Sequence, residues 1–140
     1  MDFADKRGNR VKEWIASLDR GARVKEWIAS LDRGAQVEVK AALNTQLRIL
    51  AARERLGRPD VGFMRRECKG LLEIVLTVGN VEYRPLAYYG PDTRKRQVTI
   101  LRGAIEKDGR LQPPTACATA LRRIEEIRSG AGKAVPHDYS

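Results

Sequence analysis

Three runs of β-branched and aromatic residues in the second half of the chain most constrain what this sequence can fold into. The runs are Leu71–Val78, Val81–Tyr89 and Gln97–Ile105, and only Gly79-Asn80 separates the first two. Such residues favour strands, and a two-residue link that begins with glycine suits a tight hairpin because glycine readily adopts positive φ. The runs therefore predict an antiparallel sheet of three to four strands.

Helices are expected both before and after these runs in the sequence. Gln36–Leu56 is the strongest helical segment, because its apolar residues recur with helical spacing, at Val39, Leu43, Leu47 and Leu50. A last helix is expected after Pro113-Pro114-Thr115, with an apolar side at Cys117, Leu121 and Ile124 and a basic side at Arg122, Arg123 and Arg128. Helices beside an antiparallel sheet make an α+β fold.

The remaining segments have no clear pattern of their own. We interpret Asp60–Lys69 as a linker, Lys107–Gln112 as a charged loop, and residues 130–140 as a flexible tail that carries the only histidine, His137. The sequence therefore predicts one domain over residues 1–129 followed by this tail.

A tandem repeat precedes the long helix. Residues 10–22 read RVKEWIASLDRGA, and residues 23–35 repeat them letter for letter. Each copy has apolar residues at helical spacing: Val11, Trp14, Ile15 and Leu18, then Val24, Trp27, Ile28 and Leu31. In one straight helix, positions one repeat unit apart differ in direction by about 220° around the helix axis. A single helix would therefore place the two tryptophans on different faces.

Two short helices joined by a turn are therefore expected in the repeat. A fold with one place for this helix seats one copy. The other copy would pack elsewhere, exchange between the subunits of a homodimer, or stay exposed as a tolerated insertion.

Composition narrows the class of protein. The chain has 140 residues, 42% of them hydrophobic, which is enough for one core and excludes a wholly disordered chain. The sequence has no apolar run long enough to span a membrane and no secretory signal, so we expect a soluble cytoplasmic protein. Cys68 and Cys117 are interpreted as packing thiols. The net charge of +9 favours a polyanionic partner such as nucleic acid or an acidic protein.

The candidate functional residues are cations. The sequence has no metal-ligand cluster, phosphate loop or histidine pair, and so no metal or cofactor is expected. Tyr83 could stack on a base, and the cations could bind phosphates: Arg84, Arg102, Lys107, Arg110, Arg65, Arg66 and Lys69. Two interpretations of Arg84 remain open, a phosphate contact or an ion pair with Glu73 or Glu82 across the hairpin.

The order of several motifs resembles the RelE/ParE toxin superfamily, and most closely its phage-derived, HigB-like branch. These motifs are RVKEWIASLD, LGRPD, KGLLEIVLTVGNVEYRPLAYY and VTILRGAIEK. Tyr83-Arg84 matches the branch's Tyr-Arg pair, Lys107 matches one lysine of its Lys-Lys pair, and Glu73 matches the glutamate of its Trp-Glu-Leu-Arg strand. The branch's first strand, which precedes the tryptophan-containing helix, is missing here or reduced to Asp2–Ala4.

This resemblance implies a RelE-like fold and a toxin that cleaves mRNA on the ribosome without a metal and so inhibits translation. It also implies a cognate antitoxin, with a helix-turn-helix domain, as partner. Arg84, Lys107 and Arg102 would be catalytic, and RNA would be bound by Arg65, Arg66, Lys69, Arg110 and Tyr83.

Several positions depart from the branch, among them Leu72, Arg102 and Ala104, and two further departures define an alternative. Val75 and Glu106 stand where the branch carries cations. The alternative is a non-enzymatic binding module on the same fold, either a degenerate toxin bound to its antitoxin or a ParE-like inhibitor of a topoisomerase.

Overall fold

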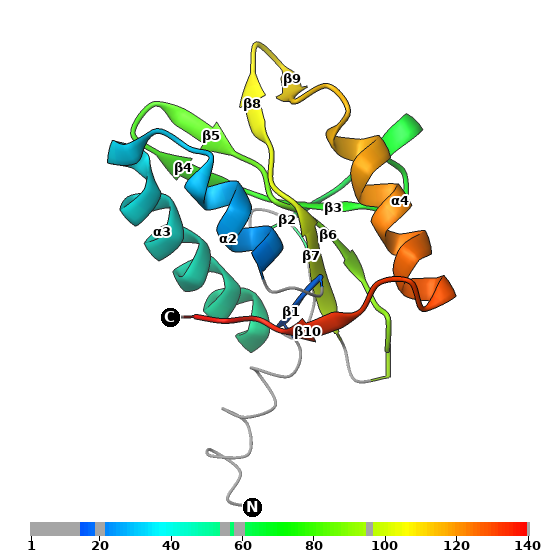
Figure 1. Cartoon of the computed structure of the whole chain (residues 1–140). Coiled ribbons are helices and arrows are strands. Elements are labelled where there is room, and N and C mark those ends of the chain that lie inside the picture. Colours follow the sequence, from blue (N-terminus) through cyan, green and yellow to red (C-terminus); the bar gives the residue numbers. More distant parts are fainter. Residues whose placement is uncertain (1–14, 19–21, 54–56, 58–60, 95–96, 140) are drawn as a thin grey trace, which may run out of the picture.

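The fold is α+β, as expected. The computed structural model describes residues 15–18, 22–53, 57, 61–94 and 97–139, and Figure 1 shows their arrangement. The helices are α2 (Ala22–Ala29), α3 (Arg33–Ala52), the 3₁₀ helix η1 (Arg66–Cys68) and α4 (Ala116–Ser129). The strands are β1 (Ile15–Leu18), β2 (Val61–Phe63), β3 (Leu72–Ile74), β4 (Leu76–Val78), β5 (Val81–Tyr83), β6 (Leu86–Tyr89), β7 (Val98–Arg102), β8 (Ile105–Lys107), β9 (Arg110–Gln112) and β10 (Ala134–Pro136).

The strands form two sheets, one of six strands and one of four, whereas a single sheet of three to four strands was expected. One sheet has the order β10-β1-β7-β6-β3-β2, and the other has the order β4-β5-β8-β9. All neighbours are antiparallel except β1 and β7, which pair in parallel. The additional strands come from segments with weak sequence patterns, including β2 inside the expected linker.

Each of the three expected strands is present, but each is divided in two along one line of the sheet. The divisions fall between β3 and β4, between β5 and β6 at Arg84-Pro85, and between β7 and β8 at Gly103-Ala104. Two backbone hydrogen bonds cross this line, from Ile74 N to Pro85 O at 2.8 Å and from Arg84 N to Ala104 O at 2.7 Å. The two sheets are therefore joined through continuous chain and backbone hydrogen bonds. Proline, which has no N–H, stands where the strand is irregular, as expected.

Two tight turns set the register of the second sheet. Gly79 has the positive φ of +62° that the first position of the β4–β5 turn demands, which confirms the expected hairpin. Asp108 and Gly109 both have positive φ, at +52° and +76°, and they join β8 to β9. The expected charged loop is therefore a second hairpin, and Asp-Gly is a strong sequence signal for such a turn.

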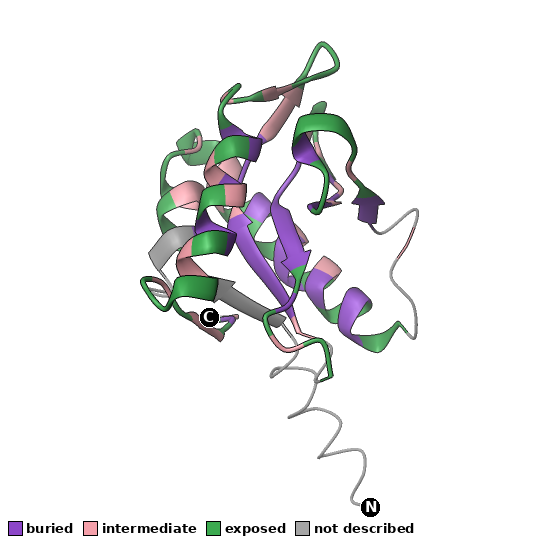
Figure 2. Cartoon of the chain, turned by 90° about the vertical axis from the view of Figure 1, so that its right-hand side faces the viewer, coloured by how far each residue is buried: buried purple, intermediate pink, exposed green. Residues whose placement is uncertain are grey.

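Helices cover both faces of the strands. α2 and α3 lie on one side and α4 on the other (Figure 1). The α3 residues predicted to face the core are buried, namely Val39, Leu43, Leu47 and Leu50. Figure 2 shows that buried residues gather on the central strands and on the inward sides of the helices. Alternation along β7 follows this layering, because Val98 and Ile100 pack beneath α2 and α3 while Leu101 packs beneath α4.

The repeat gives two different structures from identical residues. The second copy forms α2 as expected, and Val24, Trp27, Ile28 and Leu31 pack against the core. The first copy contributes β1, so the expectation of a helix there was wrong for Ile15–Leu18. Val11, Trp14 and Asp2–Ala4 lie outside the described residues. Within one chain, the strand pairing of β1 outweighs the weak helical preference of a short segment. The exchange of copies between subunits stays a prediction.

The C-terminal segment is packed, in contrast to the flexible tail that we expected. β10 pairs with β1, and His137 is buried, with its Nε2 atom 3.0 Å from Oδ1 of Asn44. The amide of Asn44 donates to the carbonyl of Tyr139 at 2.9 Å, and the Arg48 guanidinium lies over the Tyr139 ring. These contacts from α3 hold a segment whose own sequence has little pattern.

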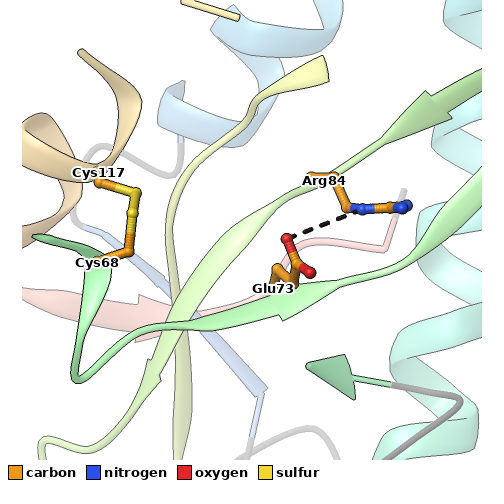
Figure 3. Close-up of a disulfide and its surroundings, with 4 residues drawn as sticks. All are labelled: Cys68, Glu73, Arg84 and Cys117. Atoms are coloured by element: carbon orange, nitrogen blue, oxygen red, sulfur yellow. Dashed lines mark ion pairs between the residues drawn. A yellow bond between two sulfur atoms is a disulfide. The ribbon is translucent and has the colours of Figure 1, made fainter. Parts of the chain in front are cut away.

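A disulfide also differs from expectation. Cys68 of η1 and Cys117 of α4, which we interpreted as packing thiols, are bonded with their Cα atoms 5.3 Å apart (Figure 3). The two cysteines lie far apart in the sequence, and only the packing of η1 against the first turn of α4 brings them together.

We predict that His137 makes stability depend on pH. Burial lowers the pKa of His137 from 6.5 to about 4, so the proton binds more tightly in the unfolded chain. Stability is therefore full above pH 6.5 and falls as pH drops from 6.5 towards 4, by about 2–3 kcal/mol. Urea unfolding across this range should show the fall. Because the chain has one histidine, His137→Gln should flatten the curve between pH 6.5 and 5. An unchanged slope in the variant would contradict the assignment.

A second prediction concerns the contact between α2 and β7. A Cβ atom on Gly103 would lie 1.8 Å from the Trp27 ring, and no comparable neighbour surrounds Gly34 in α3. Gly103→Ala should therefore lower the free energy of unfolding by about 1–3 kcal/mol, because the ring cannot move without disturbing the core. Gly34→Ala should be neutral or raise it by up to about 1 kcal/mol, because alanine favours a helix. Denaturant midpoints of the two variants would test this contrast.

Candidate functional site

Three carboxylates surround the side chain of Arg84, which is only 8% exposed. Its Nη2 atom lies 2.8 Å from Oε1 of Glu82 and 3.6 Å from Oε2 of Glu106. Its Nε atom lies 3.8 Å from Oε2 of Glu73, as drawn in Figure 3. The ion-pair interpretation of Arg84 is thus confirmed for Glu73 and Glu82, and Glu106 is a third partner that we did not expect. We call these four residues the Arg84 cluster.

Strand periodicity brings the cluster together. Tyr83, Ile105, Leu72 and Ile74 pack beneath α2 and α3, so the residues next to them in sequence face the other side of the sheet. Those neighbours are Arg84, Glu82, Glu106 and Glu73. Glu82 and Glu106 are also paired across β5 and β8. Alternation and register therefore place all four side chains on the face that carries α4.

The carboxylates of the cluster differ in their affinity for protons. The hydrogen bond from Arg84 lowers the pKa of Glu82 below its ordinary value. Glu106 has a raised pKa, chiefly because its carboxyl group shares a hydrogen bond with Glu82 and also because it is partly desolvated. A proton held between the two carboxyl groups relieves the repulsion of like charges placed side by side. The Nη1 atom of Arg84 is buried and has no hydrogen-bond partner.

The other two predicted catalytic residues do not join the cluster. Arg102 lies two residues after Ile100 and Lys107 two residues after Ile105, and both isoleucines face α2 and α3. Alternation therefore directs Arg102 and Lys107 away from the face of Arg84. Arg102 instead lines a pocket beside Trp27 of α2.

The predicted RNA-binding residues form two exposed groups and one buried ring. Arg110 is exposed in the β8–β9 hairpin, where its cross-strand partner is Lys107, the exposed residue that was predicted to be catalytic. Arg65, Arg66 and Lys69 are exposed around η1. Tyr83 is buried and meets Trp27 edge-on, with ring centroids 6.3 Å apart, so it cannot offer a stacking face to a base. Arg123, expected on the basic side of α4, is buried and donates to the carbonyl of Leu101 at 2.6 Å.

A groove of about 500 Å³ lies on the α4 face, between that helix and the strands β2, β3 and β6. Phe63 and Tyr89 line it and are 62% and 41% exposed. Lys69 and Arg128 also line it. The hydroxyl of the adjacent Tyr88 is buried without a hydrogen-bond partner, and burial raises its pKa. Exposed aromatic rings at a groove are typical of binding surfaces.

Two features of the site were not recognised in the sequence. In the sequence Glu106 stands only where the resemblance implies a cation. Its place in the third strand run, opposite Glu82 of the second, gives a pair of like charges that needs a compensating group. The aromatic groove depends on β2, which has no clear strand pattern. Among the described residues no group of side chains could hold a metal ion.

Comparisons with protein-family models, with curated proteins and with solved structures find no match for this chain. In the part of the chain that the structure describes, the helices are too short or too polar to span a membrane.

The cluster predicts opposite pH effects for two of its carboxyl groups. The raised pKa of Glu106 adds stability at low pH that is lost as pH rises through the folded-state pKa, so Glu106→Gln should remove this loss and make the protein relatively more stable at pH 7–8. The lowered pKa of Glu82 adds stability that is lost as pH falls, so Glu82→Gln should remove this acid sensitivity and weaken the fold at neutral pH.

Urea unfolding between pH 4 and 8 would measure both effects. Glu125→Gln is a suitable control, because Glu125 is exposed on α4, outside the cluster, and forms an ion pair with Arg128. Equal pH profiles for the two cluster variants would contradict the shared proton.

Proposed function

We propose that this chain is the toxin-fold component of a toxin–antitoxin pair and that it acts by binding an acidic protein partner, without cleaving RNA at Arg84. The observation that carries this proposal is the Arg84 cluster. A phosphate at Arg84 would have to compete with Glu82, which already accepts a hydrogen bond from the guanidinium, and with the ion-paired carboxylates of Glu73 and Glu106. It would also enter a site with more negative than positive charge, which disfavours an anion.

The assignment to the RelE/ParE superfamily rests on the motifs and is supported by the layout of the chain. The helices α2 and α3 precede the three expected strand runs, and α4 follows them. The first copy of the repeat supplies β1 before the helix of Trp27, where the resemblance implies a first strand. No sequence relative carries this assignment, and it therefore stays a proposal.

The groove on the α4 face is the surface that we assign to the partner. Phe63 and Tyr89 would be buried by a bound segment, and burial of aromatic rings supplies much of the free energy of protein binding. Lys69 lines the same groove and would attract acidic residues, whereas Arg128 is already paired with Glu125, which also lines the groove. The net charge of +9 favours the same class of partner, which in a toxin–antitoxin pair is the antitoxin.

RNA cleavage is the second candidate. It is favoured by the exposed cations outside the cluster, in particular Lys107 and Arg110 of the β8–β9 hairpin. In this alternative, Arg84 would exchange its carboxylate partners for a phosphate when RNA binds, and the cytoplasm would be its place of action.

Induced expression in bacteria distinguishes the two candidates. The wild-type chain should leave the 5′ ends of cellular mRNA unchanged, and Arg84→Ala should behave in the same way. The double variant Lys107→Ala/Arg110→Ala controls for general binding of RNA to the basic hairpin. New 5′ ends with wild type that disappear in Arg84→Ala would overturn the proposal and establish cleavage at this site.

The binding surface needs a separate measurement with the purified antitoxin. Phe63→Glu and Tyr89→Glu should each weaken the complex at least about tenfold, because each places a negative charge in an apolar contact with an acidic partner. Val37→Glu, at a position on α3 that is 77% exposed, adds the same charge outside the groove and should leave the affinity unchanged. Equal weakening by all three variants would exclude the groove as the binding surface.

A further inference from the structure

A separate pocket of about 330 Å³ opens between α2 and the segment that leads into α4. Its wall includes Trp27 and Ser30 from the second copy of the repeat, Arg102 from β7, Gln112 from β9 and Arg123 from α4. Because Arg102 and Arg84 face opposite sides of the sheet, this pocket is distinct from the Arg84 cluster. The volume lies within the range of small-molecule sites.

Arg102 is the group in this pocket that most needs a partner. Its side chain is half-buried, and its Nε atom is buried without a hydrogen-bond partner. A buried donor that has lost its water and gained no acceptor destabilises the fold. An oxygen atom of a bound ligand would satisfy the Nε–H and would also meet the positive charge of the guanidinium.

Arg123 places a second guanidinium in the same wall. Its side chain is buried, and its Nη1 atom donates to the carbonyl of Leu101, the residue before Arg102, at 2.6 Å. This hydrogen bond fixes one end of the guanidinium against β7 and so holds the two arginines at neighbouring positions. The one carboxylate in the wall, Glu26, belongs to an exposed residue of α2. The pocket is therefore positively charged on balance.

The remaining wall suits a planar ring. Trp27 is half-buried, and its indole packs against Gly103 closely enough to exclude a Cβ atom there. The indole is thus held in place while it lines the pocket. Ser30 and Gln112 add polar groups that can hydrogen-bond to a ligand.

We propose that this pocket binds a nucleoside phosphate, with the phosphate between Arg102 and Arg123 and the base beside Trp27. Paired guanidinium groups recognise phosphate oxygens, and an indole edge or face accommodates a nucleobase. The phosphate could belong to a free mononucleotide or to the terminal phosphate of an RNA strand. The site does not depend on the proposed function, since neither Arg84 nor the groove on the α4 face contributes to it.

Tryptophan fluorescence provides the test. The chain has two tryptophans, so Trp14→Phe leaves Trp27 as the only reporter. In this background, adenosine monophosphate should quench the emission saturably, with a Kd below about 1 mM. Inorganic phosphate should compete with it. Arg102→Ala should weaken the binding about tenfold to a hundredfold, because it removes charge-assisted hydrogen bonds to the phosphate.

Two further variants distinguish a loss of phosphate binding from a loss of folding. Ser30→Asp adds a carboxylate to the wall while Arg102 stays in place, and it should also weaken the binding at least about tenfold. Arg94→Ala removes the same charge from the exposed turn between β6 and β7 and should leave the Kd unchanged. Absence of saturable binding to the Trp14→Phe protein, or equal weakening by Arg94→Ala, would overturn the proposal.

Oligoribonucleotides identify the source of the phosphate. A short RNA with a terminal monophosphate that binds more tightly than adenosine monophosphate, and loses this advantage when the phosphate is removed, would assign the pocket to RNA ends. Equal or weaker binding of the oligonucleotide would assign it to free mononucleotides. Either result supports the phosphate site, provided that Arg102→Ala weakens it.

Discussion

Two backbone hydrogen bonds at the line that divides the strands determine the rest of this structure. They join Ile74 to Pro85 and Arg84 to Ala104, at the places where the β3–β4, β5–β6 and β7–β8 segments change from one sheet to the other. Apolar packing also spans this line, since Leu76 and Tyr83 of one sheet share a core with Leu72 and Ile74 of the other, and the hydrogen bonds add a direct backbone connection there. Because they fix the register on both sides, they also determine which side chains face α4. The Arg84 cluster follows from this register, since Glu82 and Glu106 become neighbours only when β5 and β8 pair as they do.

Local sequence patterns predicted which helices and strands form better than they predicted which of these elements contact one another. The helical spacing of Val39, Leu43 and Leu47 is strong over many turns, and α3 buries all three. Gly79-Asn80 encodes its own turn geometry, and the hairpin is present. In contrast, β2 and β10 are short, and their strand structure depends on partners distant in the sequence. The disulfide is a similar case, because no local feature of Cys68 or Cys117 indicates that η1 packs against α4.

The candidate site shows the same limit in its electrostatics. The sequence pattern placed Arg84 inside a single strand run, whereas the structure places it at the break between β5 and β6, and the sequence left open whether it pairs with a carboxylate. Which carboxylates reach it depends on strand register across the dividing line, and this information is not local. Likewise, the net positive charge gives no indication that acidic residues gather at the one place where the resemblance implies bound phosphate. The excess cations instead lie in the β8–β9 hairpin, around η1 and in the pocket beside Trp27.

The position of β1 links the duplication to the other end of the chain. β1 lies between β7 and β10, and it is the only strand with which β10 pairs among the described residues. Residues 15–18, which form β1, belong to the first copy of the repeat. The strand structure of Ala134–Pro136 therefore depends on one copy of a duplicated segment more than a hundred residues earlier in the sequence.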